Sequence, residues 1–138
     1  MKSAVFMMAL SMTISIVFTM ESAIAPGTRC SKPEKGRCPF ISGTCGQYNR
    51  LDDFIYCDHD CTCEGTNICP TDKDHALKVE TSILFTCHPI SKIRKCDNGE
   101  VSLVFFQPGS IGLVRCICSG GRKNVQVEQD GKFHFVCS

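Results

Sequence analysis

Twelve cysteines, all of them after residue 25, constrain this 138-residue chain more than any other feature. Without residues 1–25 the chain has 138 − 25 = 113 residues, of which cysteine makes up about 11%. That fraction is typical of a scaffold held by disulfides, and the even count allows every cysteine to pair. We predict disulfides at Cys30, Cys38, Cys45, Cys57, Cys61, Cys63, Cys69, Cys87, Cys96, Cys116, Cys118 and Cys137.

The first 25 residues have the layout of a secretory signal peptide. Lys2 supplies a positive start, a mostly apolar run spans residues 4–20, and small residues stand at Ala23 and Ala25. The run contains several hydroxyl side chains and is short for a transmembrane anchor. We therefore expect cleavage near residue 25 and a secreted, extracellular product without a stable membrane anchor. Such a product passes through the oxidising compartments in which disulfides form.

The rest of the chain divides into a loop-rich first part and a β-rich second part. Residues 26–69 have few apolar runs, so cysteine bridges would have to hold their shape. Residues 70–80 begin with a polar run and predict a linker or an exposed loop. Residues 81–138 form a second cysteine module. Its runs rich in apolar, β-branched and aromatic residues, which are typical of strands rather than helices, occur at 82–87, 101–106, 111–118, 125–128 and 133–137.

Turn sequences separate these runs. They are Asp97-Asn98-Gly99, Pro108-Gly109-Ser110, Ser119-Gly120-Gly121 and Asp130-Gly131. Residues of these types adopt the backbone angles that tight turns need. Together with the absence of helical periodicity after the leader, they predict a small disulfide-rich, all-β fold of short antiparallel strands and loops, in one module or two.

Both parts contain a C-x-C pattern followed by a glycine, at 61–65 and at 116–120. Neighbouring side chains on a strand point to opposite faces, so the two cysteines of each pattern should bond to different partners. Seven cysteines precede the segment 70–80 and five follow it. If all of them pair, at least one bridge crosses that segment. A division between Cys63 and Cys69 instead gives six and six, and the sequence leaves both arrangements open.

The spacing of the cysteines at 45–69 resembles the cysteine core of von Willebrand factor type C modules and of pacifastin-family protease inhibitors. The shared pattern is a C-x-C that follows another cysteine closely and precedes a glycine and a further cysteine. This chain departs from it with three residues between Cys57 and Cys61 and with no adjacent cysteine pair later. The resemblance implies a small twisted sheet for protein recognition, or a protease-blocking loop, and it assigns no reactive-site residue.

Three other functions are alternatives to protein binding: a phospholipase-like enzyme, a zinc-binding protein and a peptide precursor. Cys57-Asp58-His59-Asp60-Cys61 is superficially similar to the His-Asp dyad of secreted phospholipase A2, but it lacks the glycine-rich calcium loop. Four thiolates, of Cys57, Cys61, Cys63 and Cys69, could bind zinc, although secretion favours disulfides. Gly121-Arg122-Lys123 resembles a hormone-precursor cleavage signal. We expect no enzyme activity, no bound metal and no cofactor.

At the level of class, the chain resembles cysteine-rich proteins of arthropod venom and saliva, including scoloptoxin-like toxins. The resemblance implies a protein that binds an extracellular protein, such as a channel, a receptor or a protease. We expect a monomer. The chain has no sustained basic stripe with interleaved aromatic residues, so we expect no binding of nucleic acid. The candidate contact residues are the charged side chains of three loops, namely Lys32, Lys35 and Arg37, then Asp58, Asp60 and Glu64, and finally Lys92, Arg94 and Lys95.

Overall fold

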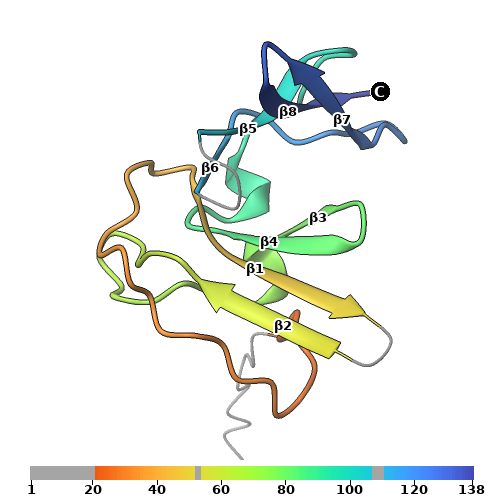
Figure 1. Cartoon of the computed structure of the whole chain (residues 1–138). Helices are drawn as coiled ribbons and strands as arrows, with labels where there is room; N and C mark the ends of the chain where they lie inside the picture. The colour runs from red at the N-terminus through yellow and green to blue at the C-terminus, as the bar shows by residue number, and fades with distance from the viewer. Residues whose placement is uncertain (1–20, 52–53, 107–110) are drawn as a thin grey trace, which may run out of the picture.

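The computed structural model describes residues 21–51, 54–106 and 111–138. Within these ranges the chain is almost entirely β-structure, which confirms the predicted fold class (Figure 1). The turn expected at 108–110 and most of the expected signal peptide lie outside the described residues. The elements are β1 (Thr44–Leu51), β2 (Phe54–His59), η1 (Lys73–His75), β3 (Ala76–Val79), β4 (Ser82–Thr86), η2 (Ile90–Lys92), β5 (Val101–Phe105), β6 (Gly112–Val114), β7 (Asn124–Gln129) and β8 (Lys132–Cys137).

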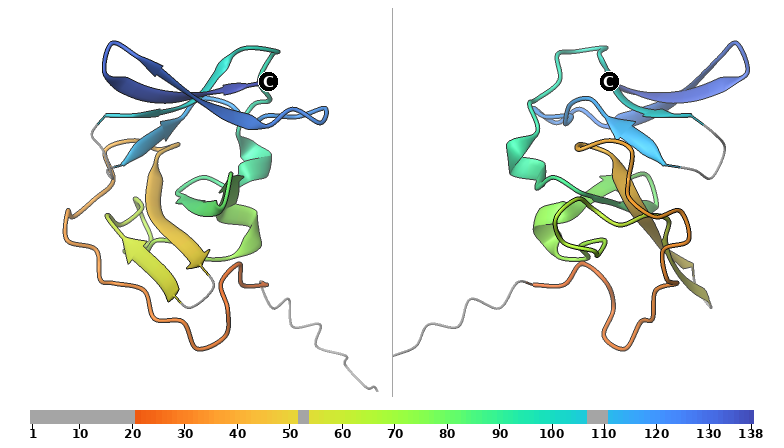
Figure 2. Two further views of the ribbon diagram at one scale, coloured as in Figure 1. Left: turned by 45° about the vertical axis from the view of Figure 1, so that its right-hand side comes forward. Right: turned by 90° about the vertical axis from the view of Figure 1, so that its left-hand side faces the viewer.

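The strands form two antiparallel four-stranded sheets, with orders β2-β1-β4-β3 and β6-β5-β8-β7. The second sheet crosses over the end of the first (Figure 2). The two orders are the same if β1 to β4 are matched in turn with β5 to β8. The similar C-x-C patterns therefore belong to a structural duplication.

Backbone hydrogen bonds around each C-x-C support this equivalence. The Cys38 N–H donates to the carbonyl oxygen of Thr62 over 2.8 Å, and the Cys96 N–H donates to that of Ile117 over 2.8 Å. Thr62 and Ile117 are the middle residues of the two C-x-C patterns. Thr62 forms a parallel bridge with Arg37, directly before Cys38, and Ile117 forms one with Lys95, directly before Cys96. The first half, with β1 to β4, and the second half, with β5 to β8, thus fix their C-x-C segments beside an earlier cysteine in the same way.

All twelve cysteines form disulfides, as predicted. The pairs are Cys30–Cys57, Cys38–Cys61, Cys45–Cys69, Cys63–Cys87, Cys96–Cys116 and Cys118–Cys137. The two cysteines of each C-x-C bond to different partners, and one bridge, Cys63–Cys87, crosses the segment 70–80; both predictions are confirmed. The division into six and six is excluded, because Cys45–Cys69 and Cys63–Cys87 both cross the boundary between Cys63 and Cys69. Eight cysteines pair within 30–87 and four within 96–137.

The first half has a disulfide at a position where the second half has a hydrogen bond. Cys69 comes six residues after Cys63, and Asn124 comes six residues after the equivalent Cys118. The partner of Cys69 is Cys45, whereas the Ser102 hydroxyl donates to the Asn124 side-chain oxygen over 2.6 Å. Ser102 and Asn124 therefore occupy the places of Cys45 and Cys69 in the duplicated fold.

Two hydrophobic clusters stabilise the sheets. One surrounds Phe85 and Tyr48 on the first sheet and is covered by residues of the N-terminal segment, among them Ala23 and Ile24. The other lies between the sheets and contains Leu84, Leu103, Val114 and Phe135 together with Leu77 and Val79. The first sheet therefore buries apolar residues on both faces, with sulfur atoms filling much of the interior on the N-terminal side.

The first half is more regular than its composition suggested. The loop-rich module expected at 26–69 contains β1 and β2, and the linker expected at 70–80 contains η1 and β3. β3 pairs with β4 along its whole length, so this segment belongs to the first sheet. The connection between the sheets is residues 87–100, without a strand.

Residues 21–25, expected at the end of the signal peptide, contact the folded domain. The Ala23 N–H donates to the carbonyl oxygen of Thr71 over 2.9 Å, and Lys73 forms an ion pair with Glu21 over 2.6 Å. Cleavage after residue 25 would remove both contacts.

Candidate binding surface

A cleft of about 360 Å³ opens between the two sheets beside the β3–β4 hairpin. Its walls carry three phenylalanine rings, those of Phe105, Phe133 and Phe135, next to the side-chain amides of Gln47 and Gln126. A concave surface of aromatic rings with a few polar groups is typical of a binding site. This cleft is therefore the leading candidate for a functional site.

The alternation of β8 and β7 directs the cleft residues to one face of the second sheet. Phe133 and Phe135 are two residues apart on β8, so their side chains share a face. Their cross-strand partners on β7 are Glu128 and Gln126. Phe135 is buried and stacks edge-to-face on Phe105, whereas Phe133 remains 40% exposed. The sheet thus presents one accessible aromatic ring at the cleft.

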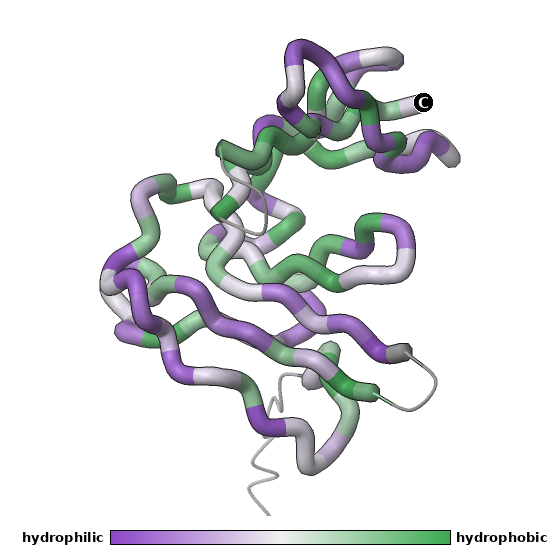
Figure 3. The backbone as a smooth tube through the Cα atoms, viewed as in Figure 1, coloured by the Kyte–Doolittle hydropathy of each residue, from purple (hydrophilic) through white to green (hydrophobic). Residues whose placement is uncertain are grey.

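A second group of exposed apolar residues lies on β2. Phe54 is 60% exposed, and Ile55 and Tyr56 follow it on the same edge strand. They form a hydrophobic stretch at the start of the strand (Figure 3). Because Phe54 and Tyr56 are two residues apart, their rings share one face, with centroids 6.4 Å apart. This stretch lies on the first sheet and does not line the cleft.

The structure brings the first basic loop and the acidic loop together. Lys32, Lys35, Asp58 and Asp60 line one small pocket of about 150 Å³. The Lys35 N–H donates to the carbonyl oxygen of Asp60 over 3.1 Å. Burial raises the pKa of the Asp60 carboxyl, and the charge of Lys35 opposes that rise. The two loops thus face each other and do not form two separate charged patches.

The remaining candidate contact residues lie elsewhere. Arg37 is exposed next to Cys38, and Glu64 lines a different pocket, of about 320 Å³, under Cys38 and Cys87. Lys92 and Lys95 are exposed in the connection between the sheets. None of the nine charged residues lines the cleft between the sheets.

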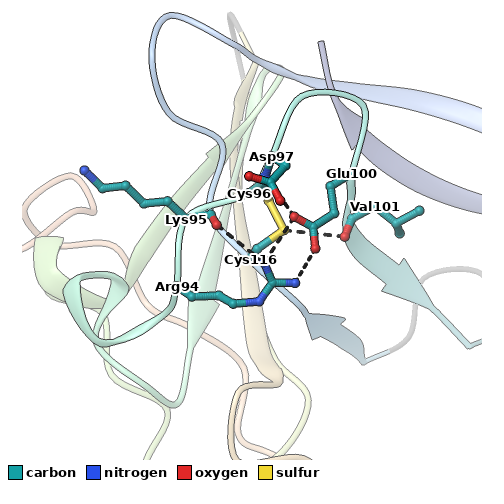
Figure 4. Close-up of polar contacts among 7 residues, drawn as sticks. All are labelled: Arg94, Lys95, Cys96, Asp97, Glu100, Val101 and Cys116. Carbon is teal, nitrogen blue, oxygen red and sulfur yellow. Dashed lines mark hydrogen bonds and ion pairs between the residues drawn. A yellow bond between two sulfur atoms is a disulfide. The ribbon is translucent and has the colours of Figure 1, made fainter.

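Arg94 is engaged by an internal ion pair. Its guanidinium donates two hydrogen bonds to the Glu100 carboxylate, one of them over 3.1 Å (Figure 4). The same carboxylate accepts the N–H of Asp97 over 2.8 Å. Glu100 therefore closes the turn at 97–100, next to the Cys96–Cys116 bridge. The hydrogen bond from Arg94 and that from Asp97 lower the pKa of Glu100 to about 2.

Arg94→Met should raise the midpoint of the Glu100 titration from about 2 toward the ordinary value of 4.5. The ionised carboxylate is favoured in the folded state, so its contribution to stability is present above pH 4.5 and is lost as the pH falls through about 2. The side-chain carboxyl resonance of Glu100, followed by NMR from pH 7 to pH 1.5, measures the midpoint. Lys95→Met is the control, and an equal midpoint in wild type and Arg94→Met would contradict the assignment.

His59 is partly buried and lines the same small pocket as Asp58 and Asp60. Its ring packs edge-to-face on Phe85, and its Nε2 atom is buried without a hydrogen-bond partner among the described residues. Burial lowers the pKa of His59, while the charge of Asp58 opposes the shift. The adjacent Asp58 accepts a hydrogen bond from the Tyr56 hydroxyl. These contacts give His59 a packing role in the first sheet.

The cysteines proposed as zinc ligands are used in bridges. Cys57, Cys61, Cys63 and Cys69 belong to four different disulfides, so none of them supplies a thiolate. That alternative is wrong.

The basic pair Arg122-Lys123 lies in the loop directly before β7. Lys123 exchanges two backbone hydrogen bonds with Ser138, of 2.9 and 3.0 Å. The Cys118–Cys137 bridge spans the pair. Cleavage there would therefore leave the C-terminal segment covalently attached.

No protein-family model and no curated protein matches the chain. The search of solved structures finds a similar fold in unliganded Argos. The TM-score is 0.55 at 14% sequence identity, and the match covers 75% of this chain. The chain covers 56% of the Argos chain, so it spans little more than half the length of that structure. At this identity the similarity to Argos shows a shared fold. The described residues include no helix of the length and apolarity that crossing a membrane requires.

Proposed function

We propose that this chain is a secreted toxin-like or effector-like protein that binds an extracellular protein, such as a receptor, a channel or a protease. The cleft between the sheets carries the proposal, because it places the exposed ring of Phe133 beside Phe105, Phe135 and two side-chain amides. Aromatic residues in a pocket are typical anchors of protein interfaces.

The scaffold supports this role. Six disulfides hold the strands that line the cleft, and a rigid surface loses little conformational entropy when it binds. The same bridges favour an oxidising, extracellular environment.

Phe133→Asp should weaken binding of a target by about tenfold or more, since it places a carboxylate in the aromatic cleft. The full chain is expressed with its leader, recovered from the medium and applied to an array of purified receptor ectodomains, channels and proteases. We expect saturable binding to at least one member. Inhibition of a protease in the array would support the inhibitor form of the proposal.

Val125→Asp is the matched control. Val125 is 43% exposed, close to the 40% of Phe133, and it lies on the opposite face of the same sheet, opposite Val136. Its replacement should leave binding unchanged. Absence of the protein from the medium, absence of saturable binding, or equal loss in both variants would contradict the proposal.

A further inference from the structure

The four outer strands of the two sheets differ in how their free edges are covered. β2 is covered by Ser31, whose N–H donates to the carbonyl oxygen of Cys57 over 3.0 Å and whose hydroxyl accepts the His59 N–H over 3.1 Å. β6 is covered by Ser42, whose carbonyl oxygen accepts the Val114 N–H over 3.0 Å. β3 and β7 have no such cover among the described residues.

β7 presents a regular row of unused backbone groups. The reciprocal hydrogen bonds between Lys123 and Ser138 fix the pattern, so the backbone of Val125 and Val127 also faces β8. The N–H and C=O groups of Gln126 and Glu128 therefore point away from the sheet. No hydrogen bond among the described residues reaches them.

Two of the usual protections of an edge, proline and a bulge, are missing from β7, which carries one charged side chain, Glu128. Its six residues, NVQVEQ, contain no proline, and its pairing with β8 has no bulge. Natural sheets normally protect an exposed edge with such features, because an open edge accepts a further strand. β7 is thus a template for an extended peptide.

The charges beside β7 indicate which peptide fits. A second cleft, of about 420 Å³, lies between β3 and residues 117–124, and it is lined by Lys78, Arg122 and Lys123 against one carboxylate, Glu80. None of these four side chains takes part in an ion pair of the described residues. Three cationic groups against one anionic group favour acidic side chains on the incoming strand.

We infer that the open edge of β7 binds an extended acidic segment of a partner protein, which adds as a further strand beside Gln126 and Glu128. The inference rests on the proposed binding function and names the binding mode. Backbone hydrogen bonds to β7 supply affinity, while Lys78, Arg122 and Lys123 select acidic residues.

A displayed library of random ten-residue peptides, selected on the full disulfide-bonded protein, tests this inference. Enriched peptides should carry Asp or Glu at alternate positions. A synthetic peptide of that sequence should slow amide hydrogen exchange at Gln126 and Glu128 but leave Val125 and Val127 unchanged, since the latter are already bonded to β8. Lys123→Glu should lower the affinity of the protein for that peptide by about tenfold.

Gln126→Pro tests the role of the β7 edge without removing a hydrogen bond of the fold. Proline removes an N–H that points outward, so the β7–β8 hydrogen bonds remain, and peptide binding should be lost. Ile55→Pro, on the edge strand β2, is the control that should keep binding. If Gln126→Pro does not fold, the test is the amide hydrogen exchange of Gln126 and Glu128 in the wild-type protein with and without the peptide.

Several outcomes would overturn the inference: no enrichment of acidic peptides, binding without protection of Gln126 and Glu128, or a dimer in sedimentation whose formation protects the same amides. The array of purified proteins, tested with Phe133→Asp, is independent of the peptide library. A failure of the β7 edge thus leaves the result of that array, and with it the proposed function, unaffected.

Discussion

Phe85→Ala should lower the free energy of unfolding by about 3 to 5 kcal/mol, the range for a buried phenylalanine. Phe85 is fully buried on β4, a central strand of the first sheet, and its backbone lies between those of Gly46 and Ala76. Its ring contacts His59 edge-to-face with centroids 6.2 Å apart. Truncation would leave a cavity among disulfides that cannot readily move inward.

Denaturant unfolding with the disulfides intact measures this loss. Phe54→Ala is the control, since that ring is 60% exposed and its removal should change stability by no more than about 0.5 kcal/mol. A loss below about 1 kcal/mol for Phe85→Ala would show that the first sheet does not depend on this ring.

Ser102→Cys together with Asn124→Cys should form a seventh disulfide and stabilise the protein by about 3 kcal/mol. The two residues occupy the places of Cys45 and Cys69, and their side chains already touch over 2.6 Å. A new bridge would restrict the unfolded chain between them, as the Cys45–Cys69 bridge does in the first half.

The intact mass should be lower by two hydrogens than that of the same variant with only six bridges, and peptide mapping should place the new bond at 102–124. Ser102→Ala with Asn124→Ala is the control: it removes the same hydrogen bond without adding a bridge and should destabilise by about 1 kcal/mol. Free thiols at both new positions would contradict the equivalence of the two halves.

The sequence predicted the strands after residue 81 better than those before it. The later strands contain apolar runs separated by turn residues, and β4, β5, β7 and β8 all lie where those runs predicted them. β1 contains Gln47, Asn49 and Arg50, so its composition does not suggest a strand. Pairing on both sides, with β2 and β4, makes it one, which is a tertiary effect that local composition does not contain.

The candidate site was harder to predict than the fold. Charged loops were the visible feature of the sequence, but Arg94 is engaged by Glu100, and Lys35 lies against Asp60. The cleft depends on the crossing of two sheets, which brings Gln47 beside Phe133 from far along the chain. The alternation of Phe133 and Phe135 around His134 was the sequence feature that could have indicated an aromatic face.

The pairing of the cysteines also determines how the protein would respond to a nick. Four overlapping bridges run without interruption from Cys30 to Cys87, so a single cut in that range leaves the two pieces tethered. No bridge passes over residues 88–95, which contain Lys92, Arg94 and Lys95. A trypsin-like protease could cut the chain there. The two fragments would then separate on denaturation without any reductant, and each would keep its own bridges.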